Sequence, residues 1–174
     1  MATFNLDKAH SELEFKVRHM MISSVKGLFG DFDIELTSDS EKLSGAQIDV
    51  TIQTASINTK NEQRDQHLKS ADFFDVAGFP EITFKSTSID EKSDTDFVVK
   101  GDLTIKGITK PIEFDVECGG AGKDPWGNIK VGYTINGKLN REDFGLTWNA
   151  ALETGGVMVS NEVKFSGEIQ FAKS

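Results

Sequence analysis

The side chains suited to acid–base or anion-binding chemistry are few and fall in short segments of the chain. There are three histidines and three arginines among 174 residues, against 16 lysines. Arginine presents a rigid planar fork of donors that suits a carboxylate or a phosphate, whereas lysine serves a general solvated surface. Arg64 and Arg141 each lie near acidic residues, and Arg64 precedes His67 by three positions. Two interpretations stay open: these arginines fix loops through salt bridges, or they bind the polar head group of a ligand.

None of these residues forms a recognisable catalytic or metal-binding set. His10 is followed by Ser11, but neighbours on a strand point to opposite faces, and the chain has no Gly-x-Ser-x-Gly motif. His10, His19 and His67 lack HxH or HxxxH spacing. The single cysteine, Cys118, cannot form an internal disulfide or a thiolate metal cluster. We therefore expect no catalytic residue, no metal and no other cofactor.

Alternation of apolar and polar residues with a period of two dominates the chain and predicts strands. His19 ends an inward row that contains Phe15 and Val17, so it is either a hydrogen-bonded core residue or a ligand contact. Each alternating segment has one apolar face, which favours antiparallel pairing around a single interior. The sequence predicts an all-β fold, an eight-stranded antiparallel barrel with long strands, from segments within residues 13–19, 32–36, 48–52, 82–84, 97–105, 112–116, 129–139 and 163–171.

One segment breaks the alternation and predicts a short helix. Residues 61–71 have a helical composition, with Asn58 or Thr59 as the expected N-cap, and Phe73 and Phe74 follow them. A short helix packed over one end of the barrel is the simplest arrangement. No internal repeat, low-complexity tract or linker interrupts the chain, so we expect a single domain over residues 1–174.

Composition narrows the classes of function. The chain has 28 acidic and 19 basic side chains, a formal net charge of -9, and 13 phenylalanines. The acidic balance argues against nucleic-acid binding and against general docking on anionic lipid surfaces, because both depend on lysine and arginine. No segment approaches the ~20 apolar residues of a membrane span, and the first residues lack the features of a secretory signal. We expect a cytoplasmic protein with an apolar interior and no stable membrane anchor.

A set of motifs occurs in a fixed order along the chain: Asp7-x-x-His10-Ser11, Phe15-x-Val17-x-His19, Gly27-x-Phe29-Gly30-x-Phe32, Ser56-Ile57-x-Thr59, Arg64-Asp65-x-His67-Leu68-x-Ser70-x-Asp72-Phe73-Phe74, Pro80-x-Ile82-x-Phe84, Gly101-x-Leu103-Thr104-Ile105-x-Gly107-Ile108-Thr109-Lys110-Pro111 and Arg141-x-Asp143-Phe144-Gly145-Leu146. Together they resemble the YceI-like family of bacterial polyisoprenoid-binding, lipocalin-like proteins, over nearly the whole chain. The resemblance implies an extended barrel around a long apolar tunnel that holds a polyprenyl chain or another long-chain amphiphile. It also leaves a homodimer open.

Three functions are compatible with these features. The first is the non-enzymatic transport, storage or sequestration of a long-chain isoprenoid-type lipid in the tunnel. The second is the binding of an isoprenoid quinone or a fatty-acid-derived amphiphile with a redox or stress role. The third is an enzyme that acts on such a lipid, although the sequence offers no convergent acid–base pair for it. We favour the first.

The expected ligand contacts come from the inward faces of the strands and from the helix. At the entrance, an unpaired polar head group is costly to bury, so we expect Arg64, His67 and Arg141 to contact it. Phe73 and Phe74 should close over the first carbons of the tail. Inside the barrel, the side chains expected to contact the tail are Phe15, Val17, His19, Phe32, Ile34, Phe84, Phe97, Val99, Phe114, Val131, Tyr133, Phe165 and Phe171.

Overall fold

The computed structural model describes residues 2–20, 22–38, 43–149 and 159–173. Its strands are β1 (Ala2–Leu6), β2 (Glu12–His19), β3 (Ser23–Phe29), β4 (Phe32–Ser38), β5 (Gln47–Gln53), β6 (Ile57–Asn58), β7 (Glu81–Glu91), β8 (Asp96–Ile105), β9 (Ile108–Lys123), β10 (Ile129–Asn140) and β11 (Val159–Lys173). The helix α1 spans Glu62–Lys69, and four 3-10 turns are η1 (Lys8–His10), η2 (Leu43–Gly45), η3 (Thr54–Ser56) and η4 (Arg141–Phe144).

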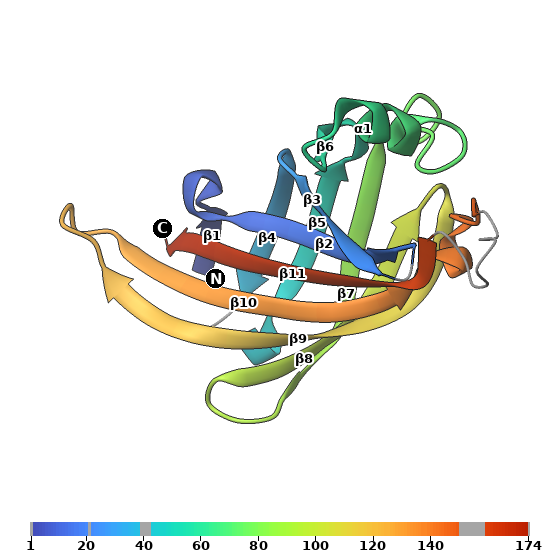
Figure 1. Cartoon of the computed structure of the whole chain (residues 1–174). Coiled ribbons are helices and arrows are strands. Elements are labelled where there is room, and N and C mark those ends of the chain that lie inside the picture. The colour runs from blue at the N-terminus through green and yellow to red at the C-terminus, as the bar shows by residue number, and fades with distance from the viewer. Residues whose placement is uncertain (1, 21, 39–42, 150–158, 174) are drawn as a thin grey trace.

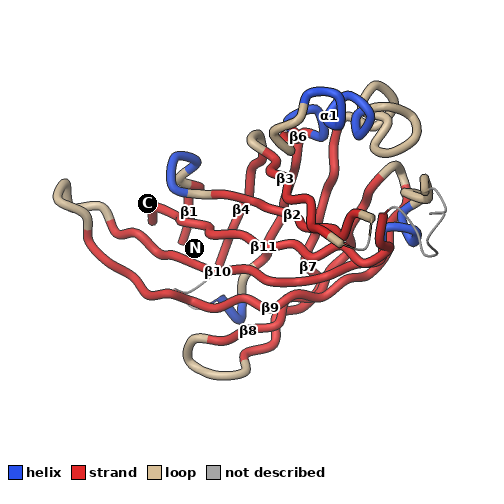
Figure 2. Tube along the Cα trace, viewed as in Figure 1, coloured by secondary structure: helices blue, strands red, loops and turns tan. Residues whose placement is uncertain are grey.

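Within the described residues, these strand segments close into one antiparallel barrel of eight strands (Figures 1 and 2). Three of the eight strands are interrupted: β1 leads into β2, β3 into β4, and β5 into β6. Because β2 and β1 pair with successive parts of β11, and β1 also pairs with β4, the ring closes. The eight-stranded antiparallel barrel predicted from the alternation is confirmed.

The sequence prediction omits three of the strand segments, β1, β3 and the two-residue β6. The first has only five residues, and the second begins with two serines and carries Gly27 opposite the inward Phe15. A glycine at an inward position hides the apolar alternation on which the prediction depends. These segments lengthen three of the eight strands and leave their number unchanged.

The helix, Glu62–Lys69, lies within the predicted residues 61–71, but neither Asn58 nor Thr59 is its N-cap. Its N-cap is Asn61, whose side-chain oxygen accepts a hydrogen bond from the backbone N–H of Arg64 at 3.0 Å. Thr59 is buried and has another role, because its backbone N–H donates to Asp65. Figure 1 shows α1 over one end of the barrel, with both chain termini toward the other end.

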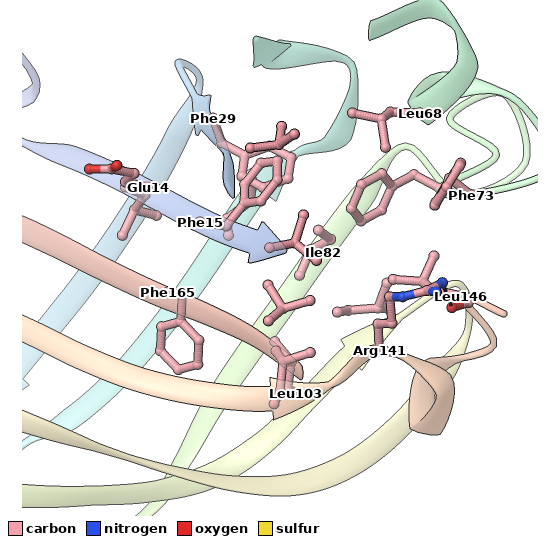
Figure 3. Close-up of a pocket in the computed structure, with 18 of the residues that line it drawn as sticks. Glu14, Phe15, Phe29, Leu68, Phe73, Ile82, Leu103, Arg141, Leu146 and Phe165 are labelled. Carbon is pink, nitrogen blue, oxygen red and sulfur yellow. Dashed lines mark hydrogen bonds between the residues drawn. The ribbon is translucent and has the colours of Figure 1, made fainter. Parts of the chain in front are cut away.

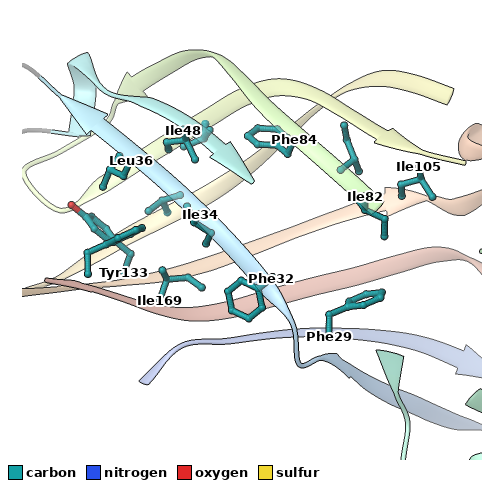
Figure 4. Close-up of a cluster of buried hydrophobic side chains, with 14 of the residues drawn as sticks. Phe29, Phe32, Ile34, Leu36, Ile48, Ile82, Phe84, Ile105, Tyr133 and Ile169 are labelled. Carbon is teal, nitrogen blue, oxygen red and sulfur yellow. The ribbon is translucent and has the colours of Figure 1, made fainter. Parts of the chain in front are cut away.

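The half of the barrel near the chain termini is filled with side chains and is called the packed half. Among the buried side chains in Figure 4, Leu36, Ile48, Tyr133 and Ile169 do not line the cavity described below. Val99 has 0% of its surface exposed, and the ring of Phe171 contacts Phe4 at 6.4 Å and Tyr133 at 6.0 Å between centroids. Burial raises the pKa of the Tyr133 hydroxyl to about 12. This end of the barrel is therefore closed by packed aromatic and aliphatic side chains.

A polar cluster joins the first strand to β10 at the same end. The carboxylate of Asp7 accepts a hydrogen bond from Lys130 Nζ at 3.0 Å and pairs with His10 Nδ1 at 2.9 Å. The Lys130 hydrogen bond, followed by that of His10, lowers the pKa of Asp7 from its ordinary value. The motif around Asp7 and His10 therefore connects η1 to β10.

Candidate ligand cavity

The other half of the barrel, called here the mouth half, encloses a cavity of about 550 Å³. Side chains from β2 to β5 and from β7 to β11 line it, and α1 and η4 contribute at its entrance. Figure 3 shows Phe15, Leu103 and Phe73 reaching toward a common space from different parts of the wall. The lining is mainly hydrocarbon, and Asn61, Gln63, Arg64 and His67 place polar groups at its helix end, so the cavity suits an amphiphile. Glu14 and Ser166 line it farther from the helix.

Phenylalanine rings in this wall lie over glycines on neighbouring strands, which keeps the cavity open. Phe15 is directly opposite Gly27 on β3, and Phe165 is directly opposite Gly137 on β10. A Cβ atom added to either glycine would lie 2.3 Å from the Cζ atom of its phenylalanine. Each ring therefore occupies space that a side chain on the next strand would otherwise fill, and it lies along the wall.

The entrance is covered by a lid, which consists of α1 and the turns of residues 70–79. Hydrogen bonds from the Phe74 N–H to the Leu68 carbonyl and from the Asp75 N–H to the Ser70 carbonyl fold these turns back onto the helix. The ring of Phe74 contacts that of Phe29 at 5.9 Å between centroids. The lid therefore presents aromatic and aliphatic groups to the upper part of the cavity.

Trp148 connects the lid to the opposite rim. Its ring contacts His67 at 4.8 Å and Phe73 at 5.4 Å between centroids, and His67 also contacts Phe73 at 5.1 Å. His67 Nε2 is 2.9 Å from the Asp72 carboxylate, which orients the imidazole. Trp148 is absent from the residues predicted from the sequence, because it lies outside the alternating segments and no local pattern marks its contact with α1.

Arg64 is held at the entrance by a single residue. Its Nε donates to the hydroxyl of Thr59 at 2.8 Å, and its Nη2 donates to the Thr59 carbonyl at 2.7 Å. Its Nη1 has no hydrogen-bond partner in the described part of the chain, and the side chain lines the cavity. The guanidinium is thus oriented but keeps donors available to a ligand.

Arg141 has a different environment, because it is 3% exposed and bonded to main-chain carbonyls. Its Nε donates to Ser160 at 2.8 Å, its Nη1 to Trp148 at 2.9 Å and to Leu146, and its Nη2 to Val159 at 3.2 Å. Burial lowers the pKa of this guanidinium from its ordinary value, and the nearby Glu142 opposes that effect. Arg141 therefore joins residues 146–148 to residues 159–160 at the rim, through hydrogen bonds to main-chain carbonyls rather than through a salt bridge.

The cavity brings together two thirds of the side chains expected to contact a ligand. Those that line it are Phe15, Val17, His19, Ile34, Arg64, His67, Phe73, Phe74, Phe84, Phe114, Arg141 and Phe165. The others lie outside the lining, in the hydrophobic core or packed against it: Phe32, Phe97, Val99, Val131, Tyr133 and Phe171. Most of them lie farther from the mouth, where packed side chains fill the barrel, whereas Phe32 lies opposite Ile52, which lines the cavity.

Much of the remaining lining is aliphatic, and none of these aliphatic residues was among the ligand contacts predicted from the sequence. They lie on the same inward faces as the predicted aromatic residues, so the alternation contained the signal. The preference for phenylalanine missed Leu13, Val25, Val50, Ile52, Ile82, Leu103, Ile105, Ile112, Ile135, Leu139 and Val163.

The described residues contain no group of three or more His, Cys, Asp or Glu side chains placed to hold a metal ion. The histidines are separated: His10 contacts Asp7, His67 contacts Asp72, and His19 lines the cavity. Among the described helices, none is long and apolar enough to cross a bilayer.

A closed antiparallel barrel with an apolar cavity under a helical lid defines a lipocalin-like barrel protein. Residues 4–171 match the YceI-like domain, and the chain belongs to the YceI-like family. UPF0312 proteins of Staphylococcus aureus strains N315 and Mu50 are each 47% identical to it over 175 residues, covering 100% of this chain and 99% of their own.

Solved structures share this architecture. A YCEI protein of Campylobacter jejuni is 34% identical, with a TM-score of 0.78 over 97% of this chain and 96% of its own. BcnA of Burkholderia cenocepacia has a TM-score of 0.82 at 22% identity, covering 95% of this chain and 99% of its own. A polyisoprenoid binding domain from Saccharophagus degradans has a TM-score of 0.69 at 15% identity, covering 100% of both chains. At these lower identities the last two show the fold alone.

Proposed function

We propose that this protein binds the apolar tail of a long-chain isoprenoid-type lipid in the mouth half of the barrel and carries or sequesters it without chemical change. The observation that carries the proposal is the cavity of about 550 Å³, whose lining is mainly hydrocarbon and whose entrance carries the polar side chains of Asn61, Gln63, Arg64 and His67. Such a site recognises a molecule with a long apolar tail and one polar end.

The size of the cavity sets the length of tail it encloses. A methylene group fills about as much space as a water molecule in the liquid, about 30 Å³. The cavity of about 550 Å³ therefore holds about eighteen carbons, or between three and four isoprene units. Each buried methylene contributes about 0.8 kcal/mol to binding, and a longer tail would leave its remaining carbons outside.

The head group is proposed to lie beneath the lid. Arg64 has donors available there, and Asn61, Gln63 and His67 also line this part of the cavity. Contacts with these groups would replace the water lost by a phosphate or a hydroxyl on entering. Phe73 and Phe74 would then cover the first carbons of the tail.

The comparisons support this proposal at the level of the family. The Saccharophagus degradans relative is described as a polyisoprenoid binding domain, and it shares the fold with this chain. We extend that ligand class to this protein because its own cavity is apolar.

Organic extraction of the purified protein followed by mass spectrometry tests the ligand class. An isoprenoid tail supports the proposal, whereas a fatty-acid derivative overturns that assignment. Recovery of an isoprenoid quinone would support the proposed isoprenoid tail but would identify a different head group. Recovery of a chemically altered lipid after incubation would overturn the non-enzymatic role.

A chain-length series tests the size of the site independently. For prenyl alcohols of about ten to about thirty carbons, we expect the affinity to rise with length and to level off near eighteen carbons. An affinity independent of chain length would contradict burial of the tail in the cavity.

A further inference from the structure

Four lysines lie directly opposite one another on neighbouring strands and form a row on the outer surface of the barrel. Lys26 on β3 is opposite Lys16 on β2, Lys16 is opposite Lys164 on β11, and Lys164 is opposite Lys138 on β10. All four are exposed, and none forms an ion pair in the described part of the chain. Like charges directly opposite one another destabilise a sheet, so folding alone does not account for this lysine row.

The opposite wall of the barrel follows the usual rule. On that wall, Lys85 of β7 lies between Asp49 of β5 and Asp102 of β8. Lys100 of β8 forms an ion pair with Asp90 at 3.3 Å. Cross-strand pairs of opposite charge stabilise a sheet, so the lysine row is a local departure within this same barrel.

An acidic row lies on the same wall as the lysine row, toward the packed half. Register aligns Glu12 with Glu168, Glu168 with Thr134, Thr134 with Glu117, and Glu117 with Asp96. Four residues of β11 separate the two rows, a distance of about 13 Å at 3.3 Å per residue. This wall therefore carries cations toward the mouth and anions toward the packed half, a separation hidden in the net charge of -9.

The acidic groups nearest the lysine row do not neutralise it by contact. Glu14 and Glu162 lie two residues away along β2 and β11, and Glu113, Asp115 and Asp143 line a surface pocket together with Lys138. None of these carboxylates forms an ion pair with the row in the described chain. The lid side of the rim is different, because Glu62 and Asp72 are exposed there. The cationic face is thus the wall of β3, β2, β11 and β10.

Exposed apolar side chains project from the hairpin that carries two of these lysines. Met20 is 42% exposed and Ile22 is 80% exposed, in the connection between β2 and β3. The preceding residue, His19, lines the cavity, so this tip lies at the rim. The lysine row lies about 10 Å behind the end of β2, at 3.3 Å per residue. The apolar groups thus lie at the tip and the cations lie behind them. This is the order in which a protein entering a bilayer surface would meet hydrocarbon and phosphate.

We propose that the β2–β3 tip and the lysine row dock the rim of the barrel on a bilayer that contains anionic phospholipid. Met20 and Ile22 enter the interfacial region, and the lysine row contacts the phosphates, as in other peripheral proteins. The acidic row disfavours the inverted orientation, so the cavity faces the membrane. The inference rests on the proposed function, because a lipid carrier must exchange its ligand with a membrane.

Vesicle sedimentation of the full chain tests docking without any ligand transfer. We expect binding to vesicles of phosphatidylcholine with phosphatidylglycerol, little binding to phosphatidylcholine alone, and release by salt. The variant Lys16→Gln with Lys164→Gln should bind about thirty-fold more weakly. The matched variant Lys85→Gln with Lys100→Gln has the same charge change on the opposite wall and should bind within about two-fold of the parent.

Two further measurements distinguish a loss of membrane contact from a loss of folding. The Lys16→Gln and Lys164→Gln variant should unfold at the same or a higher temperature than the parent, because it removes like-charge repulsion. Ile22→Ser should also weaken vesicle binding, since it removes an apolar group from the tip.

Three outcomes would overturn the proposal. These are equal binding to both kinds of vesicle, equal losses in the two lysine variants, or a dimer that the Lys16→Gln and Lys164→Gln variant disrupts without any vesicle binding. If an isoprenoid is extracted from the purified protein but the protein does not bind vesicles, docking is refuted and the proposed function of the cavity still stands.

Discussion

Gly137 lies directly opposite Phe165 in the β10–β11 pair, and a Cβ atom at Gly137 would be 2.3 Å from the Cζ atom of Phe165. The phenylalanine ring thus occupies the position of the missing side chain. Because the ring lies along the wall, the centre of the mouth half stays open. Gly137 on β10 therefore sets the width of the cavity, because it leaves room for the Phe165 ring of β11 beside the wall.

The Gly137→Ala variant should force the Phe165 ring toward the cavity. We expect weaker binding of an isoprenoid tail and a loss of about 1–3 kcal/mol in the free energy of unfolding, as for other overpacked sites. Gly132→Ala on the same strand is the matched control, because a Cβ atom there meets no atom within 4 Å. Tail affinity and urea unfolding measure both effects, and equal results for the two variants would contradict this account.

Replacement of Arg64 by alanine should affect the head group of the ligand more than its tail. Loss of one charge-assisted contact corresponds to about 1.5–3 kcal/mol, so a prenyl phosphate should bind about ten- to a hundred-fold more weakly. A prenyl hydrocarbon without a head group should bind as before. Lys69→Ala removes a charge from the same helix at a position that does not line the cavity. An equal loss for both ligands, with a lower thermal midpoint, would assign Arg64 to structure alone.

Arg141 should contribute mainly to stability. Arg141→Met leaves the carbonyls of Leu146, Trp148, Val159 and Ser160 without this donor. We expect the free energy of unfolding to fall by about 3 kcal/mol, measured by urea titration. Arg141→Lys should recover only part of the loss, since an ammonium cannot match the planar fork. Full recovery with lysine would show that charge, rather than the spread of donors, matters at this position.

The contacts of Trp148 with the lid should control how fast a ligand leaves. Trp148→Ala removes ring contacts with His67 and Phe73, each worth about 0.5–1.5 kcal/mol. We expect ligand dissociation to become about ten-fold faster in a stopped-flow displacement experiment. Trp126→Ala is the control, because Trp126 is 83% exposed and does not line the cavity. Unchanged dissociation in Trp148→Ala would exclude the lid as the barrier.

The contribution of Asp7 should depend on pH. Its pKa is lowered in the folded state from the ordinary 3.8, so its stabilising effect is present above that value and is lost as the pH falls through the lowered pKa. Asp7→Asn should reduce the free energy of unfolding by about 1 kcal/mol at neutral pH. The difference from the parent should shrink toward zero in acid. Urea titrations at several pH values measure this, with Asp115→Asn as an exposed control; a constant difference would contradict the assignment.

The number of strands, their antiparallel pairing and the covering helix were predictable from local patterns. Alternation reports which face of a strand is buried, and that information is contained in a few neighbouring residues. The same reasoning could not distinguish Arg64 from Arg141. Both lie near acidic residues in the sequence, but the fold buries Arg141 among carbonyls and leaves Nη1 of Arg64 available at the entrance.

The sequence by itself therefore determined the barrel and its apolar interior, and only the tertiary structure decided which part of that interior forms a cavity. Phe165 and Phe171 share the inward face of β11, yet Phe165 lies over Gly137 beside the cavity and Phe171 packs against Phe4 and Tyr133. The same holds outside, where Lys16 and Lys164 become neighbours only when β2 pairs with β11. The physical reason is that register joins residues far apart in the chain, whereas alternation is a local property.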